Sequence, residues 1–244
     1  MINIQKLKIE NLKFKIISLC VLCVLCGNVF AAEPNDILQK LNQSVKNIKN
    51  LSAQIEYTHS QPLFETQTVR IGRLFYIKDT NNSALRINFL SLKQDDLPQQ
   101  KYREDYIFDG FKLTKIDFQS KSVTTEQLAK DKPIEPFELV QSYFPIIGFS
   151  ESSALDEQFH ISVEQTEPQM VLRLIPKENS EFFKTYKQID CQIDPENFLP
   201  FNFSALTCDD EKITIRLIKT NTAAKIKRDV FNLDVPADFT KTQK

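Results

Sequence analysis

The chain has 244 residues with 31 basic and 32 acidic side chains, which gives a formal net charge of −1. A chain without excess Lys and Arg lacks the charge that binding to nucleic-acid phosphates requires, so we expect no nucleic-acid partner. It contains only 4 Gly, and no stretch rich in Gly, Ser or Pro divides it; β-rich domains of this size often remain undivided.

The N-terminus has the pattern of a secretory signal peptide. Four lysines precede the apolar run 16–26, and Val29, Phe30 and Ala31 follow with small residues suited to cleavage. The run is short for an uncleaved membrane anchor, which favours cleavage after Ala31. We therefore expect residues 1–31 to be a signal peptide and 32–244 to form a single soluble, exported domain with 27 basic and 31 acidic residues, a net charge of −4.

The region after the cleavage site predicts one amphipathic helix followed by strands. Asn35 or Asp36 can cap the helix, and one stripe at helical spacing contains Ile37, Leu38, Leu41, Val45, Ile48 and Leu51. Alternation of apolar and polar residues predicts strands at 52–58, 66–77, 85–90, 102–108, 112–118 and 121–125. Asp109 and Gly110 predict a tight turn between two of them. A sheet of this extent has to curl.

The segment 136–159 is more apolar than an ordinary surface connection. Eight large apolar or aromatic side chains lie between 137 and 149, broken by Pro145 and Gly148. A buried core helix and a lid over an apolar cavity both fit this pattern, because periodicity alone does not separate the two.

The last third of the chain predicts an antiparallel meander. A strand at 170–175 ends at Pro176, and the polar stretch 178–184 has room for one or two helical turns. Half-buried strands follow at 186–193, 201–207 and 212–218. Pro, Asn and Asp in the links 194–200 and 207–211 predict hairpin turns.

Two cysteines, Cys191 and Cys208, follow the cleavage site, in a compartment that permits disulfides. A turn near Asn197 would place Cys191 opposite Ser204 and leave Cys208 four residues further along, ~13 Å away by strand rise. A bridge needs Cα atoms within ~7 Å, although a bulge would shift the register. A disulfide and two buried free thiols both remain open.

Five motifs lie in a fixed order along the chain. They are Ile-Lys-Asn-Leu-Ser-Ala-Gln at 48–54, Gly-Arg-Leu-Phe-Tyr-Ile-Lys at 72–78, Ile-Phe-Asp-Gly-Phe-Lys-Leu at 107–113, Arg-Leu-Ile-Pro-Lys at 173–177, and Asn221 with Phe-Asn-Leu-Asp-Val-Pro at 231–236. In order and spacing, these motifs resemble the LolA family of periplasmic lipoprotein carrier proteins over essentially the whole domain. In that family, 231–236 would form the closing strand.

The resemblance implies a mainly β fold, an unclosed antiparallel β-barrel with an α-helical lid over an apolar cavity. It also implies an acylated lipoprotein or lipid as cargo, and an inner-membrane lipoprotein-releasing transporter and an outer-membrane acceptor as partners. We expect a monomer without a cofactor. Such a carrier only shields acyl chains from water, and their burial is worth ~0.8 kcal/mol per CH₂, roughly 12 kcal/mol for a 16-carbon chain.

The residues that form the candidate cavity wall are chosen by their alternating positions within the predicted strands. The strands provide Leu74, Tyr76, Ile87, Phe89, Tyr106, Phe108, Ile116 and Phe118, and the segment 136–159 provides Phe137, Val140, Phe144 and Ile147. Ordinary core packing is the alternative for each of these residues, because an alternating apolar position in a β-domain is usually core.

One position departs from the family pattern. The better-known members have an Arg directly after the Lys that matches Lys78, and this Arg holds the lid; here the position is Asp79. Closure by that Arg therefore cannot be transferred to this chain, and Arg73 or Arg86 would replace it only if the geometry allows.

Signals for catalysis or metal binding are sparse. His59 and His160 are the only histidines, and neither has metal-ligand spacing or a nearby nucleophile motif. We expect both to be solvated or hydrogen-bonded, and no metal site or enzyme activity. The acidic pairs at 95–96 and 209–210 fit solvated turns. The leading hypothesis is a carrier of lipoproteins or another lipid, and the alternative is a lipid-sensing or lipoprotein-sensing regulatory module with the same fold.

Overall fold

Strands dominate the computed structural model, which describes residues 34–79, 82–136, 152–166 and 169–243. The strands are β1 (Asn50–Gln61), β2 (Thr66–Ile77), β3 (Ala84–Gln94), β4 (Gln100–Phe108), β5 (Lys112–Asp117), β6 (Ser122–Gln127), β7 (Phe159–Thr166), β8 (Gln169–Pro176), β9 (Tyr186–Ile193), β10 (Pro200–Thr207), β11 (Lys212–Asn221) and β12 (Thr240–Gln243). The helices are α2 (Pro34–Lys46), α4 (Ser152–Gln158) and the 3₁₀ turns η1 (Pro62–Phe64) and η2 (Arg228–Phe231).

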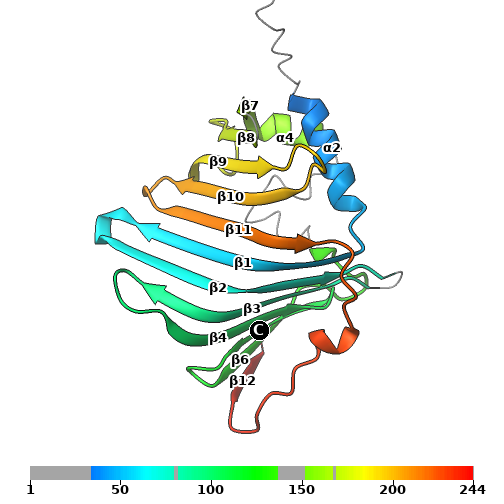
Figure 1. Ribbon diagram of the computed structural model, residues 1–244, viewed down its shortest axis with the longest axis vertical. Helices are drawn as coiled ribbons and strands as arrows, with labels where there is room; N and C mark the ends of the chain where they lie inside the picture. Colours follow the sequence, from blue (N-terminus) through cyan, green and yellow to red (C-terminus); the bar gives the residue numbers. More distant parts are fainter. Residues whose placement is uncertain (1–33, 80–81, 137–151, 167–168, 244) are drawn as a thin grey trace, which may run out of the picture. The chain divides into compact units, whose positions relative to one another are not determined.

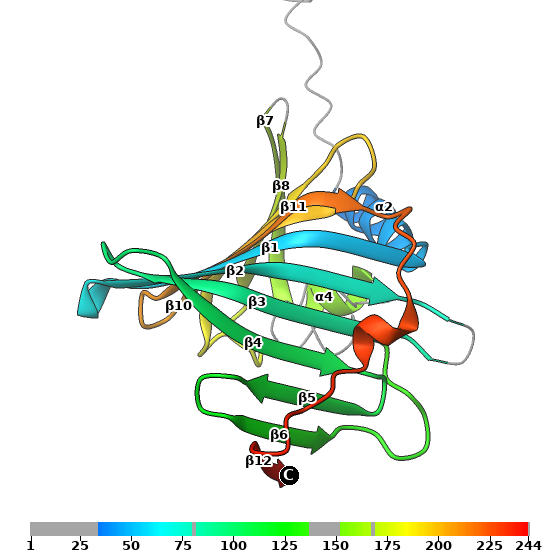
Figure 2. The same cartoon turned by 60° about the horizontal axis from the view of Figure 1, so that its bottom comes forward.

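All these strands belong to one sheet in the order β12-β6-β5-β4-β3-β2-β1-β11-β10-β9-β8-β7 (Figure 1). The sheet is unclosed, with β12 and β7 at its edges, and its pairs are antiparallel except β12 with β6. In Figure 2, β8 runs at a steep angle to β5 and β6, so the sheet curls along its width. The expected fold, a mainly β, unclosed and predominantly antiparallel sheet, is confirmed.

Most predicted strands are present, and β2 and β9 have the predicted bounds. Three predictions were wrong. The helix ends at Lys46 rather than continuing to Leu51, residues 178–184 form turns rather than a helix, and the 231–236 segment is not a strand. The last strand is instead β12, parallel to β6, and β7 was not predicted from the sequence either.

Residues that alternate along the strands divide the sheet into two faces. We call inner the face that carries Ile55 of β1, Ile87 of β3 and Tyr106 of β4, and outer the face that carries Ile77, Ala84 and Ile107. Helix α2 packs against α4 and β7 and buries its predicted stripe. The Ser44 hydroxyl of α2 also donates to the carbonyl of Asn197, 2.9 Å away, in the β9–β10 turn.

The C-terminal segment covers the outer face. Phe231 is buried against a cluster made by Ile77, Ala84, Ile107, Ile116 and Val123. The Arg86 guanidinium donates to the carbonyl of Val230 over 2.7 Å and pairs with the fully buried Asp105, with Nη2 2.7 Å from Oδ1. Asp105 therefore connects the sheet, through Arg86, to the segment that shields this face.

We expect Asp105→Asn to destabilise the protein strongly. The substitution leaves the Arg86 charge, which is 12% exposed, without its carboxylate partner, and breaking a buried ion pair from one side costs about 3–5 kcal/mol. Urea unfolding followed by circular dichroism measures the loss. Asp238→Asn is the matched control, because its pair with Lys121 is exposed on both sides; its unfolding midpoint should stay near that of the wild type. Equal midpoints for both variants would contradict this account of Asp105.

Candidate functional site

The inner face contains a hollow that no described side chain fills. Its volume is about 390 Å³, and strands β1–β4 and β9–β11 line it with Ile55, Tyr57, Arg70, Ile87, Phe89, Tyr106, Tyr186, Ala205, Ile213 and Ile215. Such a volume lies in the range of small-molecule pockets, which are mostly apolar with a few polar groups. The hollow exists because the sheet curls, which brings side chains of β4 and β9 to one space.

Strand register places these residues on one face. Tyr57 of β1 lies opposite both Arg70 of β2 and Ile215 of β11, and Ile87 of β3 lies opposite Tyr106 of β4. A β-bulge shifts the register of β2 between Ile71 and Gly72. A Cβ at Gly72 would lie 2.1 Å from the Asn88 carbonyl oxygen, so only glycine permits this close approach of β2 to β3.

The structure divides the predicted wall residues of the strands into three groups. Ile87, Phe89 and Tyr106 line the hollow. Tyr76 and Phe108, each 1% exposed, lie on the same face but pack with Leu74 into a core cluster around Ile48, Leu51 and Leu85. For these three residues, the geometry favours core packing.

Ile116 and Phe118 do not lie on the inner face, so their assignment to the cavity wall needs correction. The β4–β5 hairpin pairs Phe108 with Leu113, which sets odd-numbered residues of β5 opposite even-numbered residues of β4. Ile116 consequently faces outward into the cluster under the C-terminal segment. Phe118 packs against the same cluster, and its ring centre lies 5.4 Å from that of Phe239.

The four remaining predicted wall residues, Phe137, Val140, Phe144 and Ile147, lie outside the described residues. Other lining residues were not predicted from the sequence. Alternation along β1 and β11 would have identified Ile55, Ile213 and Ile215. Arg70 carries no such signal, because a search for apolar positions passes over a cation.

A polar cluster lies at one end of the hollow, around Glu104 of β4. Its side chain is 2% exposed, and its carboxylate is 3.1 Å from Nη1 of Arg70 and 2.6 Å from Nζ of Lys115. The hydroxyls of Tyr102 and Tyr106 each donate to the same carboxylate over 3.0 Å. Four donors match the roughly four lone-pair positions of a carboxylate, so Glu104 is saturated.

Burial and charge keep Tyr102, Tyr106 and Lys115 in one protonation state near neutral pH. Burial, with the adjacent Glu104 carboxylate, raises the pKa of Tyr102 to about 12 and also raises the pKa of Tyr106. Burial is the largest single influence on Lys115 and opposes its charged form, but the contacts with Glu104 and Tyr106 together outweigh it and raise the Lys115 pKa. The tyrosines therefore remain donors and the lysine remains a cation.

Neither arginine considered as a replacement for the family's lid-holding Arg lies on the inner face. Arg86 binds Asp105 and the Val230 carbonyl on the outer face. Arg73 lines a separate, outer hollow together with Ile71 and Leu90. Asp79, at the departing position, contacts Arg228 of η2 over 3.4 Å.

The described residues offer no group of three or more His, Cys, Asp or Glu side chains that could hold a metal ion. The Nε2 atom of His59 lies 2.9 Å from Glu211 Oε2, and Gln61 donates to the other oxygen of the same carboxylate. His160 is exposed. Within the described part of the chain, helices are too short or too polar to cross a membrane.

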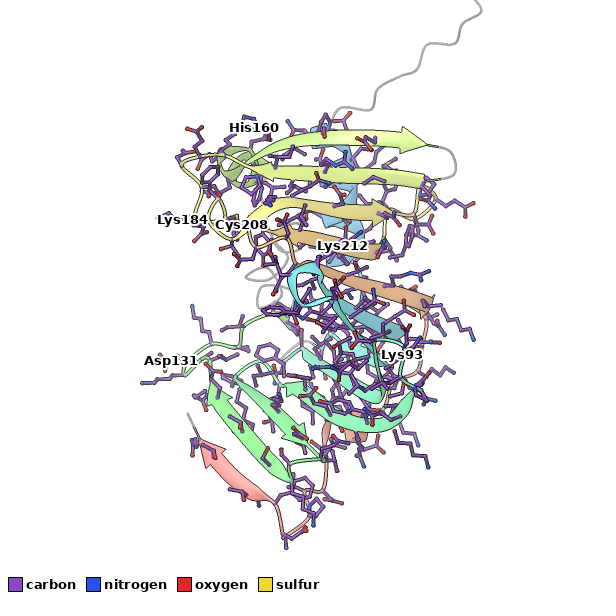
Figure 3. The ribbon with its side chains drawn as sticks, turned by 90° about the vertical axis from the view of Figure 1, so that its left-hand side faces the viewer. Lys93, Asp131, His160, Lys184, Cys208 and Lys212 are labelled. Atoms are coloured by element: carbon purple, nitrogen blue, oxygen red, sulfur yellow. The ribbon has the colours of Figure 1, made fainter. Side chains whose placement is uncertain are left out.

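Cys191 and Cys208 are free thiols in the structure, so the disulfide alternative does not hold. Cys191 pairs with Phe203 rather than with Ser204. It is completely buried, which raises the pKa of its thiol. Cys208 is exposed rather than buried, and lies near Lys184 in Figure 3, with its Sγ 3.5 Å from the Phe183 carbonyl oxygen.

Known proteins are similar to this chain in sequence pattern and in fold. A family model described as "Outer membrane lipoprotein carrier protein LolA" matches residues 98–234. No curated protein sequence matches the chain.

Solved structures share the fold at low sequence identity. A crystal structure of MucB has a TM-score of 0.54 at 11% identity, covering 87% of this chain and 66% of that one. MucB in its complex with MucA from Pseudomonas aeruginosa has a TM-score of 0.51 at 14% identity, covering 83% and 62%. An uncharacterized conserved protein from Thermus thermophilus has a TM-score of 0.50 at 8% identity, covering 86% and 98%. The chain thus spans about two thirds of the MucB chains.

The two thiols should differ sharply in reactivity. Iodoacetamide needs an accessible thiolate, so we expect native protein to be alkylated at Cys208 and not at Cys191, while unfolding in guanidinium makes both reactive. Peptide mass mapping identifies the labelled residue. Cys208→Ser should abolish labelling of the native protein at these two positions. A Cys191–Cys208 bridged peptide before reduction would refute the free-thiol assignment.

Proposed function

Since the chain belongs to the LolA family, whose model matches residues 98–234, we propose that it carries the acyl chains of a lipoprotein or another lipid in the inner-face hollow. The supporting observation is the hollow itself, an unfilled space lined on several strands by apolar side chains such as Ile87, Ile213 and Ile215. Non-directional contacts of this kind suit a protein that must also release its cargo.

The energetics of the cargo fit such a wall. Each CH₂ group moved from water to an apolar surface contributes ~0.8 kcal/mol, so a partly enclosed chain gains affinity without any specific polar contact. The same reasoning requires no cofactor and no catalytic group. We accordingly propose a binding and carrier role rather than an enzymatic one, in agreement with the family's description as a carrier.

The family also suggests where the protein acts and with which partners. We propose that the N-terminal 31 residues direct it to the periplasm and are removed. There the single domain would act as a monomer, taking lipoproteins from a releasing transporter of the inner membrane and giving them to an acceptor in the outer membrane.

A regulatory binding module is the second candidate. One similar structure contains MucB in complex with MucA, so this fold also serves in a protein–protein complex. The two functions differ in what they require of a lipid: a carrier must move it between membranes, whereas a sensor needs only to bind it.

Cargo binding is tested with a fluorescent acyl probe and with native mass spectrometry of the purified protein. Ile87→Gln places an amide in the hollow, and an uncompensated polar group costs about 1–3 kcal/mol. The affinity for the probe should therefore fall roughly 5- to 150-fold. Ile71→Gln, the same change on the outer face, should leave the affinity unchanged. Failure of wild-type protein to bind any acyl ligand would overturn the proposal.

Exposed apolar side chains in the hairpin turns at one end of the sheet, which we call the apolar tips, provide a test for transport. Leu63 and Phe64, between β1 and β2, are 79% and 69% exposed, and Leu97, between β3 and β4, is 60% exposed. Both hairpins turn at the same end, because β2 pairs with β3 from Thr68 opposite Gln94 onward. Figure 3 faces this end, where Lys93 and Lys212 are labelled. Adjacent exposed apolar residues typically mark an interaction with a membrane or a partner.

We expect the double variant Leu63→Ser/Phe64→Ser to separate binding from transfer. Binding of a detergent-dispersed probe should stay within two-fold of wild type, because neither residue lines the hollow. Extraction of a lipidated protein from vesicles should fall at least five-fold, because the tips no longer enter the lipid surface. Phe183→Ser, a partly exposed apolar residue before β9, is the control. Unchanged extraction by the double variant would favour the regulatory module.

A further inference from the structure

Arg70 is an unexpected lining residue of an otherwise apolar hollow. Its side chain is 31% exposed and lies among three aromatic rings, with the guanidinium carbon 5.8 Å from the ring centre of Tyr57, 6.0 Å from Phe89 and 5.6 Å from Tyr102. Aromatic faces hold a cation in place without neutralising it. Glu104 pairs with both Arg70 and Lys115, so these three groups together keep one net positive charge at the edge of the hollow.

The contact of Arg70 with Glu104 does not satisfy the hydrogen-bonding capacity of its guanidinium. Nη1 donates to Glu104, but Nε is buried and has no partner among the described residues. Glu104 cannot accept more, because Tyr102, Tyr106 and Lys115 occupy its remaining positions. A buried donor without an acceptor is costly, so an additional acceptor from a ligand would be favoured at this position.

Other charged groups near Arg70 are already engaged. Asp117 of β5 lies opposite Glu104, but its Oδ1 accepts the backbone N–H groups of Gln119 and Ser120 in the β5–β6 turn. Glu211 is held by His59 and Gln61. Tyr57 lines the hollow beside Arg70, and burial raises its pKa, so its hydroxyl stays protonated and can donate to an anion.

We propose that Arg70 binds the anionic head group of the cargo, a carboxylate or a phosphate, while the apolar wall holds the acyl chain. This inference depends on the proposed function, because it assigns a chemical class to the same ligand. An anion enters at the exposed edge of the guanidinium, and a small rotation of the side chain brings Nε into contact with it. Hydrogen bonds between guanidinium and oxyanion are about twice as strong as neutral ones, so the site selects anionic over neutral lipids.

Three probes with the same 16-carbon tail test the selectivity: hexadecanoate, hexadecyl phosphate and hexadecanol. Each displaces a fluorescent acyl probe from the purified protein. We expect wild type to bind one or both anions at least ten-fold more tightly than the alcohol. The two anions distinguish a carboxylate source from a phosphate source.

Two substitutions should act in opposite directions. Arg70→Met should remove the preference for anions, so that all three probes bind with similar affinity, while Lys115, Tyr102 and Tyr106 still satisfy Glu104. Glu104→Gln should increase the preference, because it removes the carboxylate that competes for Arg70. Arg73→Met, the same change on the outer face of the same strand, should behave like wild type.

The outcomes separate this inference from the proposed function. Equal wild-type affinity for the alcohol and both anions would overturn head-group recognition and leave the carrier intact. A uniform loss of affinity for all three probes in Arg70→Met would also overturn it, because it would assign Arg70 a structural role. Absence of binding by all three probes to wild-type protein would overturn the carrier function itself. Circular dichroism melting curves exclude variants that do not fold.

Discussion

The structure depends on how one continuous sheet buries the apolar side chains of its two faces, which it does incompletely. A curled sheet with apolar side chains on both sides has to cover both, because exposed apolar area is unfavourable. The C-terminal segment covers the outer face with Phe231 and is held by the contact of Arg86 with Val230. On the inner face, the described side chains leave space between Ile87 of β3 and Ile213 of β11. That unfilled space gives the fold room for a ligand.

Alternation predicted most of the sheet because apolar and polar residues alternate over much of most strands. The bounds of β2 and β9 were correct, since turn residues border both. β7 and β12 were missed for different reasons. Phe159–Thr166 follows an apolar segment that obscures where a strand begins, and the exposed β12 has no apolar face, so its place is set by backbone pairing with β6.

The site was predicted less well than the fold, because parity within a strand does not say which face an apolar residue occupies. Ile116 and Ile87 both alternate correctly, yet the Phe108–Leu113 pairing places Ile116 outward. Only hairpin register settles the face, and it depends on loop geometry. Alternation also does not say whether a residue lines the hollow or packs in the core. Tyr76 and Phe108 are on the predicted face but belong to the core. Arg70 was missed because its role depends on neighbours distant in sequence.

In the carrier that we propose, the placement of Arg70 would also affect how cargo is selected and released. A purely apolar wall gains affinity with every CH₂ group but does not distinguish one head group from another. A head-group contact at the partly exposed edge of the hollow concentrates specificity where another membrane or protein can compete for it. Glu104 already competes for the same guanidinium, with its oxygen 3.1 Å from Nη1. Loss of the anion would therefore leave Nε of Arg70, and not Nη1, without an acceptor.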